Sequence, residues 1–372
     1  MVIEQLTDED NQVELLWRTC SEALSREQKP VILFGAGVLG QYYLEFIRQL
    51  DQVKEVYFCD NHPEKWGTKI NGVEVISFDR LLADFRDSYI IVSTLQYREQ
   101  LEKQLREHGL SSLLDPQIHQ ILTDKLSLYL TFKNYRNVIE THRVSFEEVY
   151  RLLDDEFSKR LLIERLNYCI TLNTKYLTPM MSKTAKYFDP DIIRLSDHEV
   201  FIDGGGLNGD TVDEFIRQTN GKFSKVYTFE PETTKHRHFE RYASFPNIQL
   251  MPYGLYSRSG TLRFQANNDG TSSIDPDGAA EIQVVAIDEV LQGEPVTFIK
   301  MDIEGAELEA LKGAENSIRQ YKPKLAICVY HKPLDIVEIP LYLKQIVPDY
   351  KLYLRHYLFG ASETVCYAVP AN

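Results

Sequence analysis

The sequence lacks a long apolar run and a basic leader. No uninterrupted hydrophobic stretch reaches the roughly 20 residues that a membrane-spanning helix needs. The first residues, MVIEQLTDEDNQVELLW, are acidic, whereas a secretory signal begins with basic residues followed by an apolar segment. We therefore expect no membrane insertion and no secretion, and we predict a cytoplasmic protein.

Cysteine pairs and basic clusters are also missing. The five cysteines are scattered and form no CxxC pair: Cys20, Cys59, Cys169, Cys328 and Cys366. This pattern disfavours a disulfide framework or a cysteine zinc site and predicts reduced thiols. The formal net charge is −14 and no Lys/Arg-rich run occurs, which disfavours a nucleic-acid partner.

Strand-like and helix-like segments alternate along the 372 residues, a length that favours two domains. A buried strand, a glycine-rich turn, a helix and a second strand follow one another twice, over 29–118 and over 197–372. Residues 1–28 predict an N-terminal helix, and 119–196 predict a helical connector. The expected fold class is α/β, with two Rossmann-like doubly wound units, the second ending in an antiparallel hairpin.

The glycine loop of the second unit carries a ligand-binding pattern. Asp203 ends the strand VFID just before the loop, where a carboxylate can bind the ammonium group of an amino-acid-like cofactor. Glu230 ends the next strand, where a carboxylate can hold both hydroxyls of a ribose. S-adenosylmethionine carries these groups; the alternative is that Asp203 caps a helix and Glu230 is solvated. The expected cofactor contacts are Asp203, Gly204, Gly206, Asn208, Gly209, Glu230, Tyr253 and Gly254.

The C-terminal half resembles the FkbM family of methyltransferases. The similarity covers about 188–369 and rests on ordered motifs: EVFIDGGGLNGDTV, VYTFEP, PYGLYSRSGTLRF, TSSI, VVAIDEVL, FIKMDIEGAELEALKGAENSI and KPKLAICVYHKPLDIVEIP. One departure is the Gly-Gly-Gly of the loop, where an alanine is common in the middle. The resemblance implies a class I methyltransferase fold and S-adenosylmethionine as the methyl donor. It also implies a hydroxyl acceptor on a sugar or a secondary metabolite.

Two strand ends beside this loop supply candidate catalytic residues. Methyl transfer requires an aligned acceptor and the removal of its proton. Asp302 ends the strand TFIKMDI and His331 ends KLAICVYH, so neighbouring strand ends bring the two side chains together. We predict His331 as the general base, with Asp302 orienting it or contacting the cofactor; the alternative is a structural histidine. Glu304 is expected to cap the next helix, and no metal is predicted, because too few oxygen ligands can be named.

The first α/β unit carries its own GxGxxG, formed by Gly35, Gly37 and Gly40. Asp60 ends the following strand at a spacing that suits a ribose-binding acid in a dinucleotide fold. The run from 29 to 118 resembles nucleotide-binding domains of enzymes of nucleotide-sugar and surface-polysaccharide metabolism. Two interpretations remain: this domain binds a nucleotide or nucleotide sugar, or it is a scaffold without a ligand.

Three functions compete at this stage. The leading hypothesis is methylation of a hydroxyl on a small-molecule or saccharide acceptor. Such an enzyme could also be a homo-oligomer. The second is an NAD-dependent oxidoreductase or epimerase of nucleotide sugars, with its active site at the N-terminal glycine loop. No group of catalytic residues can be recognised after that loop, which counts against this hypothesis. The third is a non-catalytic binding scaffold.

Overall fold

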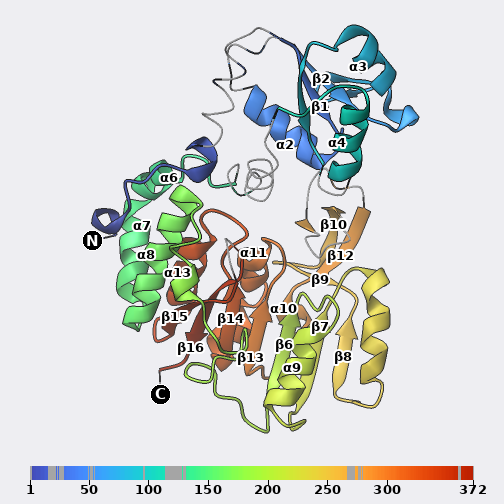
Figure 1. Ribbon diagram of the computed structural model, residues 1–372. Helices are drawn as coiled ribbons and strands as arrows, with labels where there is room; N and C mark the ends of the chain where they lie inside the picture. Colours follow the sequence, from blue (N-terminus) through green and yellow to red (C-terminus); the bar gives the residue numbers. More distant parts are fainter. Residues whose placement is uncertain are drawn as a thin grey trace. The chain divides into compact units, whose positions relative to one another are not determined.

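The computed structural model divides into two compact units (Figure 1). The smaller comprises Asp8–Lys133 and Ile170–Asn173, and the larger comprises Met1–Thr7, Asn134–Cys169 and Thr174–Asn372. Among the residues described below, no helix combines the length and apolar character required to cross a bilayer. The structure describes residues 2–15, 22, 24, 29–48, 50, 53, 55–94, 97–113, 128, 131–265, 273–274, 278, 280–358 and 362–371.

The smaller unit contains a five-stranded sheet in the order β3-β4-β2-β1-β5, parallel except for the pair β3–β4. Strand β1 pairs with both β2 and β5, so the strand order reverses beside the first glycine loop. The strands are β1 (Val31–Phe34), β2 (Val56–Cys59), β3 (Lys69–Ile70), β4 (Val73–Ile76) and β5 (Tyr89–Val92). The helices are α2 (Val38–Ile47), η2 (Pro63–Lys65), α3 (Phe78–Asp84) and α4 (Arg98–Glu107).

The larger unit is built on a seven-stranded sheet in the order β15-β16-β14-β13-β6-β7-β8. Strand β16 is antiparallel to both of its neighbours, and the other pairs are parallel. This confirms the expected parallel sheet with a terminal antiparallel hairpin. The strands are β6 (Val200–Gly204), β7 (Lys225–Phe229), β8 (Ile248–Met251), β13 (Phe298–Met301), β14 (Lys324–Cys328), β15 (Lys351–His356) and β16 (Thr364–Val369).

Helices and a second sheet complete the larger unit. The second sheet has the order β11-β10-β12-β9. Its strands are β9 (Gly254–Leu255), β10 (Gly260–Gln265), β11 (Ser273–Ile274) and β12 (Ala280–Val285). The helices are η1 (Ile3–Gln5), α6 (Tyr135–Thr141), α7 (Arg143–Leu152), α8 (Glu156–Thr171), η3 (Thr178–Met180), α9 (Asp210–Gln218), η4 (Thr233–Tyr242), α10 (Ile287–Leu291), α11 (Glu307–Lys312), α12 (Glu315–Tyr321) and α13 (Asp335–Ile346).

Stacked aromatic side chains hold the central strands of the large sheet in place. Phe201 of β6 stacks on Phe215 of α9 at 4.5 Å and on Phe298 of β13 at 4.9 Å between ring centroids. Phe188 meets Phe298 edge-on at 5.8 Å. Burying each of these rings stabilises the fold by roughly 1.5–3 kcal/mol. The ends of β6 and β13 therefore have fixed positions, which matters for the side chains that follow them.

The N-terminal segment corrects one prediction. Residues 1–28 do not form one helix, because η1 covers only Ile3–Gln5 and residues 7–11 are not helical. The Asn11 side chain accepts a hydrogen bond from the amide of Val13, so this polar stretch caps a new helical turn instead of continuing one. Val2 and Thr7 donate to Glu147 and Asn167 within the larger unit.

The segment expected to be a helical connector belongs, from Asn134 onward and except for Ile170–Asn173, to the larger unit. Arg355 of β15 pairs with Asp155 at 2.8 Å, and Ser158 accepts a hydrogen bond from the amide of Leu354. Helices α7, α8 and α13 lie together beside β15 (Figure 1). The helices thus cover one edge of the large sheet.

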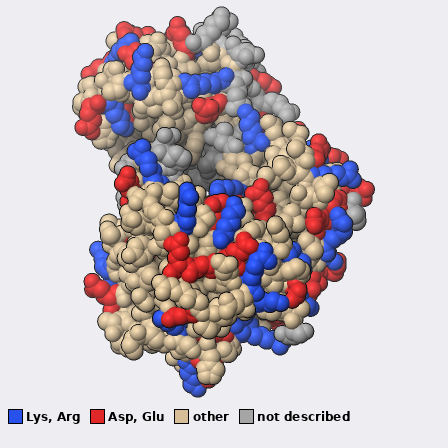
Figure 2. Space-filling model, turned by 180° about the vertical axis from the view of Figure 1, so that it is seen from behind, with Lys and Arg blue, Asp and Glu red and all other residues tan. Residues whose placement is uncertain are grey.

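The surface carries charges of both signs. Figure 2 shows Lys and Arg side chains interspersed with Asp and Glu side chains over one face of the molecule. This face therefore offers mixed charge and not a uniform basic surface of the kind that attracts polyanions.

Candidate active site

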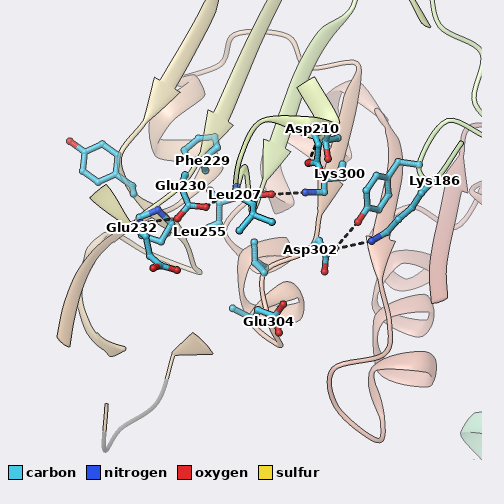
Figure 3. Close-up of a pocket in the computed structure, with 18 of the residues that line it drawn as sticks. Lys186, Leu207, Asp210, Phe229, Glu230, Glu232, Leu255, Lys300, Asp302 and Glu304 are labelled. Atoms are coloured by element: carbon cyan, nitrogen blue, oxygen red, sulfur yellow. Dashed lines mark hydrogen bonds and ion pairs between the residues drawn. The ribbon is translucent and has the colours of Figure 1, made fainter. Parts of the chain in front are cut away.

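A pocket of about 480 Å³ lies in the larger unit at the carboxyl ends of β6, β7 and β13 (Figure 3). The strand order reverses there, because β6 pairs with β7 on one side and with β13 on the other. Open α/β sheets bind ligands at such a point. Glu230, Tyr253, Gly254 and Asp302 line this pocket, and their roles in binding or catalysis stay predictions.

At Gly205 the glycine loop approaches the end of β13 too closely for a side chain. Gly205 has φ +82°, and a Cβ there would lie 1.9 Å from the carbonyl oxygen of Asp302. At Gly206 a Cβ would lie 2.5 Å from Oγ1 of Thr228. Gly209 also has a positive φ and is the N-cap residue of α9. Gly205 lines the pocket. The other predicted loop residues belong to the loop but do not line the pocket: Gly204, Gly206, Asn208 and Gly209.

Glu230 is 5% exposed and binds the loop directly. One carboxylate oxygen accepts from the amide of Leu207 and the other from the amide of Glu232, both at 2.8 Å. Burial raises the pKa of Glu230, although these amides oppose the shift. Each oxygen keeps a lone pair, so the carboxylate can accept two further hydrogen bonds from a ligand in the pocket.

Asp203 is completely buried and does not line the pocket, which corrects the expected direct contact with an ammonium group. Its carboxylate lies 3.0 Å from Nζ of Lys300 and accepts a hydrogen bond from Thr228 at 2.9 Å. Lys300 also donates to the carbonyl oxygens of Gly204 and Gly205 at 2.9 and 2.8 Å. Burial alone would lower the pKa of Lys300, but the nearby negative charges, Asp203 first among them, together raise that pKa. Asp203 thus fixes a buried cation that braces the glycine loop.

Asp302 is the centre of a polar network at the other end of the pocket (Figure 3). Oδ2 accepts from Tyr187 at 2.7 Å and from Lys186 at 3.1 Å, and Oδ1 accepts from Tyr330 at 2.9 Å. Burial alone would raise the pKa of Asp302, but the nearby cations, Lys186 first among them, hold it far below its usual value. Asp302 is therefore a carboxylate that accepts hydrogen bonds at neutral pH.

His331 lies beside Asp302, as predicted, but among three carboxylates. Its Nε2 is 3.4 Å from Oδ1 of Asp302 and 3.6 Å from Oε2 of Glu304, and its Nδ1 is 3.0 Å from Oε1 of Glu307. Burial alone would lower the pKa of His331, but these charges, led by Glu307, raise it well above its usual value. The imidazole therefore keeps its proton at neutral pH, and the predicted role of free general base does not fit this arrangement.

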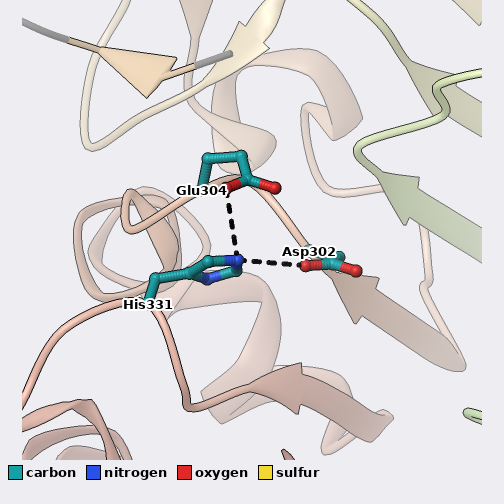
Figure 4. Close-up of side chains that lie close together, drawn as sticks. All are labelled: Asp302, Glu304 and His331. Atoms are coloured by element: carbon teal, nitrogen blue, oxygen red, sulfur yellow. Dashed lines mark ion pairs between the residues drawn. The ribbon is translucent and has the colours of Figure 1, made fainter. Parts of the chain in front are cut away.

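Glu304 does not cap the following helix by its own carboxylate as expected. Helix α11 has no side-chain cap, and its first residue, Glu307, instead accepts a hydrogen bond at 2.8 Å from the amide of Ile303 in the preceding turn. Glu304 lines the pocket and has φ +54°, an unfavourable conformation for a glutamate. The sharp turn at Glu304 and Gly305 points its carboxylate toward His331 (Figure 4).

Sequence reasoning missed several residues of the pocket. Lys300 is a lysine inside an apolar strand, and this placement was a signal that it has a buried partner. Gly205 stood out only as the middle of three glycines. Lys186 and Glu363, which pair with each other, come from segments distant in sequence and carried no signal.

In the smaller unit, Asp60 supports the first glycine loop. Its carboxylate accepts from the amides of Ala36 at 3.0 Å and His62 at 2.9 Å, and from Lys65 at 2.8 Å. Burial would raise the pKa of Asp60, but these hydrogen bonds lower it. A Cβ at Gly40 would overlap the Gly35 carbonyl, whereas Gly37 faces open space. Nucleotide binding by this unit stays a prediction.

Two family models match the chain, one for each α/β region. Residues 27–113 match "C2185-like, N-terminal", and residues 203–352 match "Methyltransferase FkbM domain". A curated relative, hexuronic acid methyltransferase AglP of Haloferax volcanii, is 32% identical over 104 residues. That match covers 26% of this chain and 44% of the relative, less than half its length.

A solved structure extends the likeness to the fold of nearly the whole chain. The methyltransferase FkbM of Methylobacillus flagellatus KT superimposes with a TM-score of 0.57 at 23% identity. The match covers 96% of this chain and 99% of that chain. The strand order and the pocket at its reversal point agree with a class I methyltransferase fold, and residues 203–352 match the methyltransferase FkbM domain model.

Proposed function

We propose that this protein is an S-adenosylmethionine-dependent methyltransferase that methylates a hydroxyl group of a saccharide or a related small molecule. The observation that carries the proposal is the pocket at the ends of β6, β7 and β13, most of whose lining residues lie within the region that matches the FkbM domain. Its volume, about 480 Å³, lies in the range of pockets that hold cofactors and drug-sized ligands.

The lining residues fit the donor at both ends. Glu230 offers two free lone pairs to a ribose diol, and Phe229, Leu255 and Ile282 supply an apolar surface for adenine. Gly205 lets a ligand approach the loop backbone, since no Cβ intervenes. The side chain of Lys186, 25% exposed, offers a positive charge near the end where the amino-acid part of the donor would lie.

Bound S-adenosylmethionine supplies a methyl group on a cationic sulfur, which keeps the electron pair of the carbon–sulfur bond when an acceptor oxygen displaces it. The protein must then align the acceptor hydroxyl and let its proton leave to a carboxylate or to water. Asp302 and Glu304 line the acceptor end and can accept hydrogen bonds from hydroxyl groups. Such carboxylates are suited to a polyhydroxylated acceptor, and the similarity to a hexuronic acid methyltransferase supports a saccharide.

Calorimetry with S-adenosylhomocysteine tests the proposal. We expect one molecule to bind per chain and Glu230→Ala to weaken binding at least tenfold, because the ribose diol loses its acceptor. Glu309→Ala, a carboxylate on α11 that does not line the pocket, is the matched control and should bind normally. Absence of binding by the folded wild-type protein would refute the donor assignment. Transfer of labelled methyl to a panel of glycans then identifies the acceptor.

A further inference from the structure

Nε2 of His331 is a buried ring nitrogen that makes no hydrogen bond to any of the described residues. The side chain is only 8% exposed. Nε2 points to the space between Asp302 and Glu304, from which it is separated by 3.4 and 3.6 Å (Figure 4). Burying a polar nitrogen without a partner is costly, so this arrangement indicates a missing ligand.

The spacing of the three ligand atoms suits a metal ion. Ligands bound at about 2.1 Å in tetrahedral or octahedral geometry lie roughly 3.0–3.4 Å from one another. The two nitrogen–oxygen distances are close to this range, and the ligand atoms of Asp302, Glu304 and His331 all lie within 4.8 Å. Modest side-chain movement would therefore close the three groups around one ion.

The other ring nitrogen has the partner that a metal-binding histidine requires. Nδ1 lies 3.0 Å from Oε1 of Glu307, whose side chain is 1% exposed. The amide of Ile303 fixes that carboxylate at 2.8 Å. Histidine ligands generally direct their second nitrogen to a carboxylate or carbonyl, which sets the ring orientation. Glu307 can play this part while Nε2 releases its proton to solvent on metal binding and faces the ion.

We propose that Asp302, Glu304 and His331 bind a divalent first-row transition-metal ion at the edge of the pocket. One imidazole and two carboxylates are a mixed set that favours Mn²⁺, Fe²⁺ or Zn²⁺ over Mg²⁺ and Ca²⁺, which prefer oxygen alone. Asp302 and Glu304 line the pocket, so the remaining coordination positions face it.

A second grouping, Glu307, His331 and Asp335, is a poorer candidate. Glu307 and Asp335 are buried and do not line the pocket. Moreover, Oδ2 of Asp335 already accepts from the amide of Lys332 at 2.8 Å. In contrast, Glu304 is 28% exposed and offers an ion a way in.

The metal gives the site a way to activate its acceptor, and this part of the inference rests on the proposed function. An acceptor hydroxyl bound to the ion would lose its proton to water more readily, because the cation stabilises the resulting alkoxide. The oxygen would then be held beside Asp302, at the end of the pocket opposite Glu230. No free histidine base is needed in this arrangement.

Titration of Mn²⁺ into the full-length, chelator-treated protein tests the proposal, with calorimetry and the electron paramagnetic resonance signal of free Mn²⁺ as readouts. We expect one site per chain. Glu304→Gln should weaken binding at least tenfold, and because this side chain lies at the pocket edge, the variant should remain folded. His331→Gln should do the same, and Glu309→Gln on α11 is the matched control that should bind normally.

Two outcomes would overturn the metal site: no Mn²⁺ binding by the folded protein, or equal affinity in the Glu304→Gln and Glu309→Gln proteins. The binding of S-adenosylhomocysteine is measured on the same samples without metal. If that ligand binds and Mn²⁺ does not, the metal proposal fails alone. If Mn²⁺ binds and the ligand does not, the site stands and the methyltransferase assignment fails.

Discussion

Gly205 shows how one absent side chain shapes the candidate site. Its backbone lies against the carbonyl of Asp302, and its φ of +82° is one that other residues adopt only with strain. The glycine therefore serves two purposes, since it allows the turn and leaves the pocket wall open. An alanine, which the family resemblance allows in the middle of this loop, does not fit this backbone.

Gly205→Ala should destabilise the protein much more than Gly221→Ala. Both glycines have positive φ, but a Cβ at Gly221 meets nothing within 4 Å, whereas at Gly205 it overlaps the carbonyl of Asp302. We expect Gly221→Ala to lower the free energy of unfolding by about 1 kcal/mol, because of the positive φ alone. Gly205→Ala should lower it by at least twice that amount, because the overlap is added. Urea unfolding of both variants measures the difference. Equal losses would show that the loop can relax.

Lys300 is the second residue whose environment sets a clear expectation. Replacing it by methionine leaves Asp203 buried without its partner, which should cost about 3–5 kcal/mol. The double change Lys300→Met with Asp203→Asn should recover part of that loss, because no unpaired charge remains. Chemical unfolding of the wild type and of these two variants forms the test. If Lys300→Met were as stable as the wild type, Lys300 and Asp203 would not form an ion pair in solution.

At the scale of elements, parallel strands bring distant residues together at one edge. Strands β6, β7 and β13 end beside one another, which places Gly205, Glu230 and Asp302 around one pocket. Hydrophobic segments and glycine spacing predicted that these strand ends, with Glu230 and Asp302, meet at one edge, but not that Gly205 lines the pocket. The helices over 134–171 were predicted as helices, but their place against β15 depends on side-chain pairs such as Asp155 with Arg355, which no local pattern reveals.

Strand β15 also carries a pH-sensitive group, His356. It is fully buried, and desolvation, followed by the charge of Arg165, lowers its pKa from 6.5 to about 4. The unfolded state binds the proton more tightly, so stability is complete above pH 6.5 and falls as the pH drops toward 4. The loss over this window should reach roughly 3 kcal/mol. Unfolding measured from pH 7 to 4 should show this slope, and His356→Gln should reduce it; an unchanged slope contradicts the assignment.

At the scale of the whole molecule, the two units carry separate glycine loops. The pocket described above is formed entirely by the larger unit. The carboxylate of Asp60 in the smaller unit already accepts hydrogen bonds from backbone amides and from Lys65. We therefore expect the methyl-donor site to act through the larger unit alone.

Saturating the intact chain with S-adenosylhomocysteine should protect the larger unit selectively. At a concentration one hundred times the dissociation constant, binding stabilises the bound fold by about 2.7 kcal/mol. Amide hydrogen exchange should therefore slow in β6, β7 and the segment after β13, while the sheet of the smaller unit exchanges at its former rate. Protection confined to 31–113 would place the ligand in the wrong unit and refute the assignment of the pocket.

The sequence by itself determined the α/β class, the hairpin at the edge of the sheet, and the motifs that bring Glu230 and Asp302 to one edge. These depend on hydrophobic periodicity and glycine spacing, which are local properties. Only the tertiary structure decided that Asp203 faces Lys300 instead of the pocket, and that His331 lies among three carboxylates. Burial and the charges of distant residues control those outcomes, and both arise only once the chain is folded.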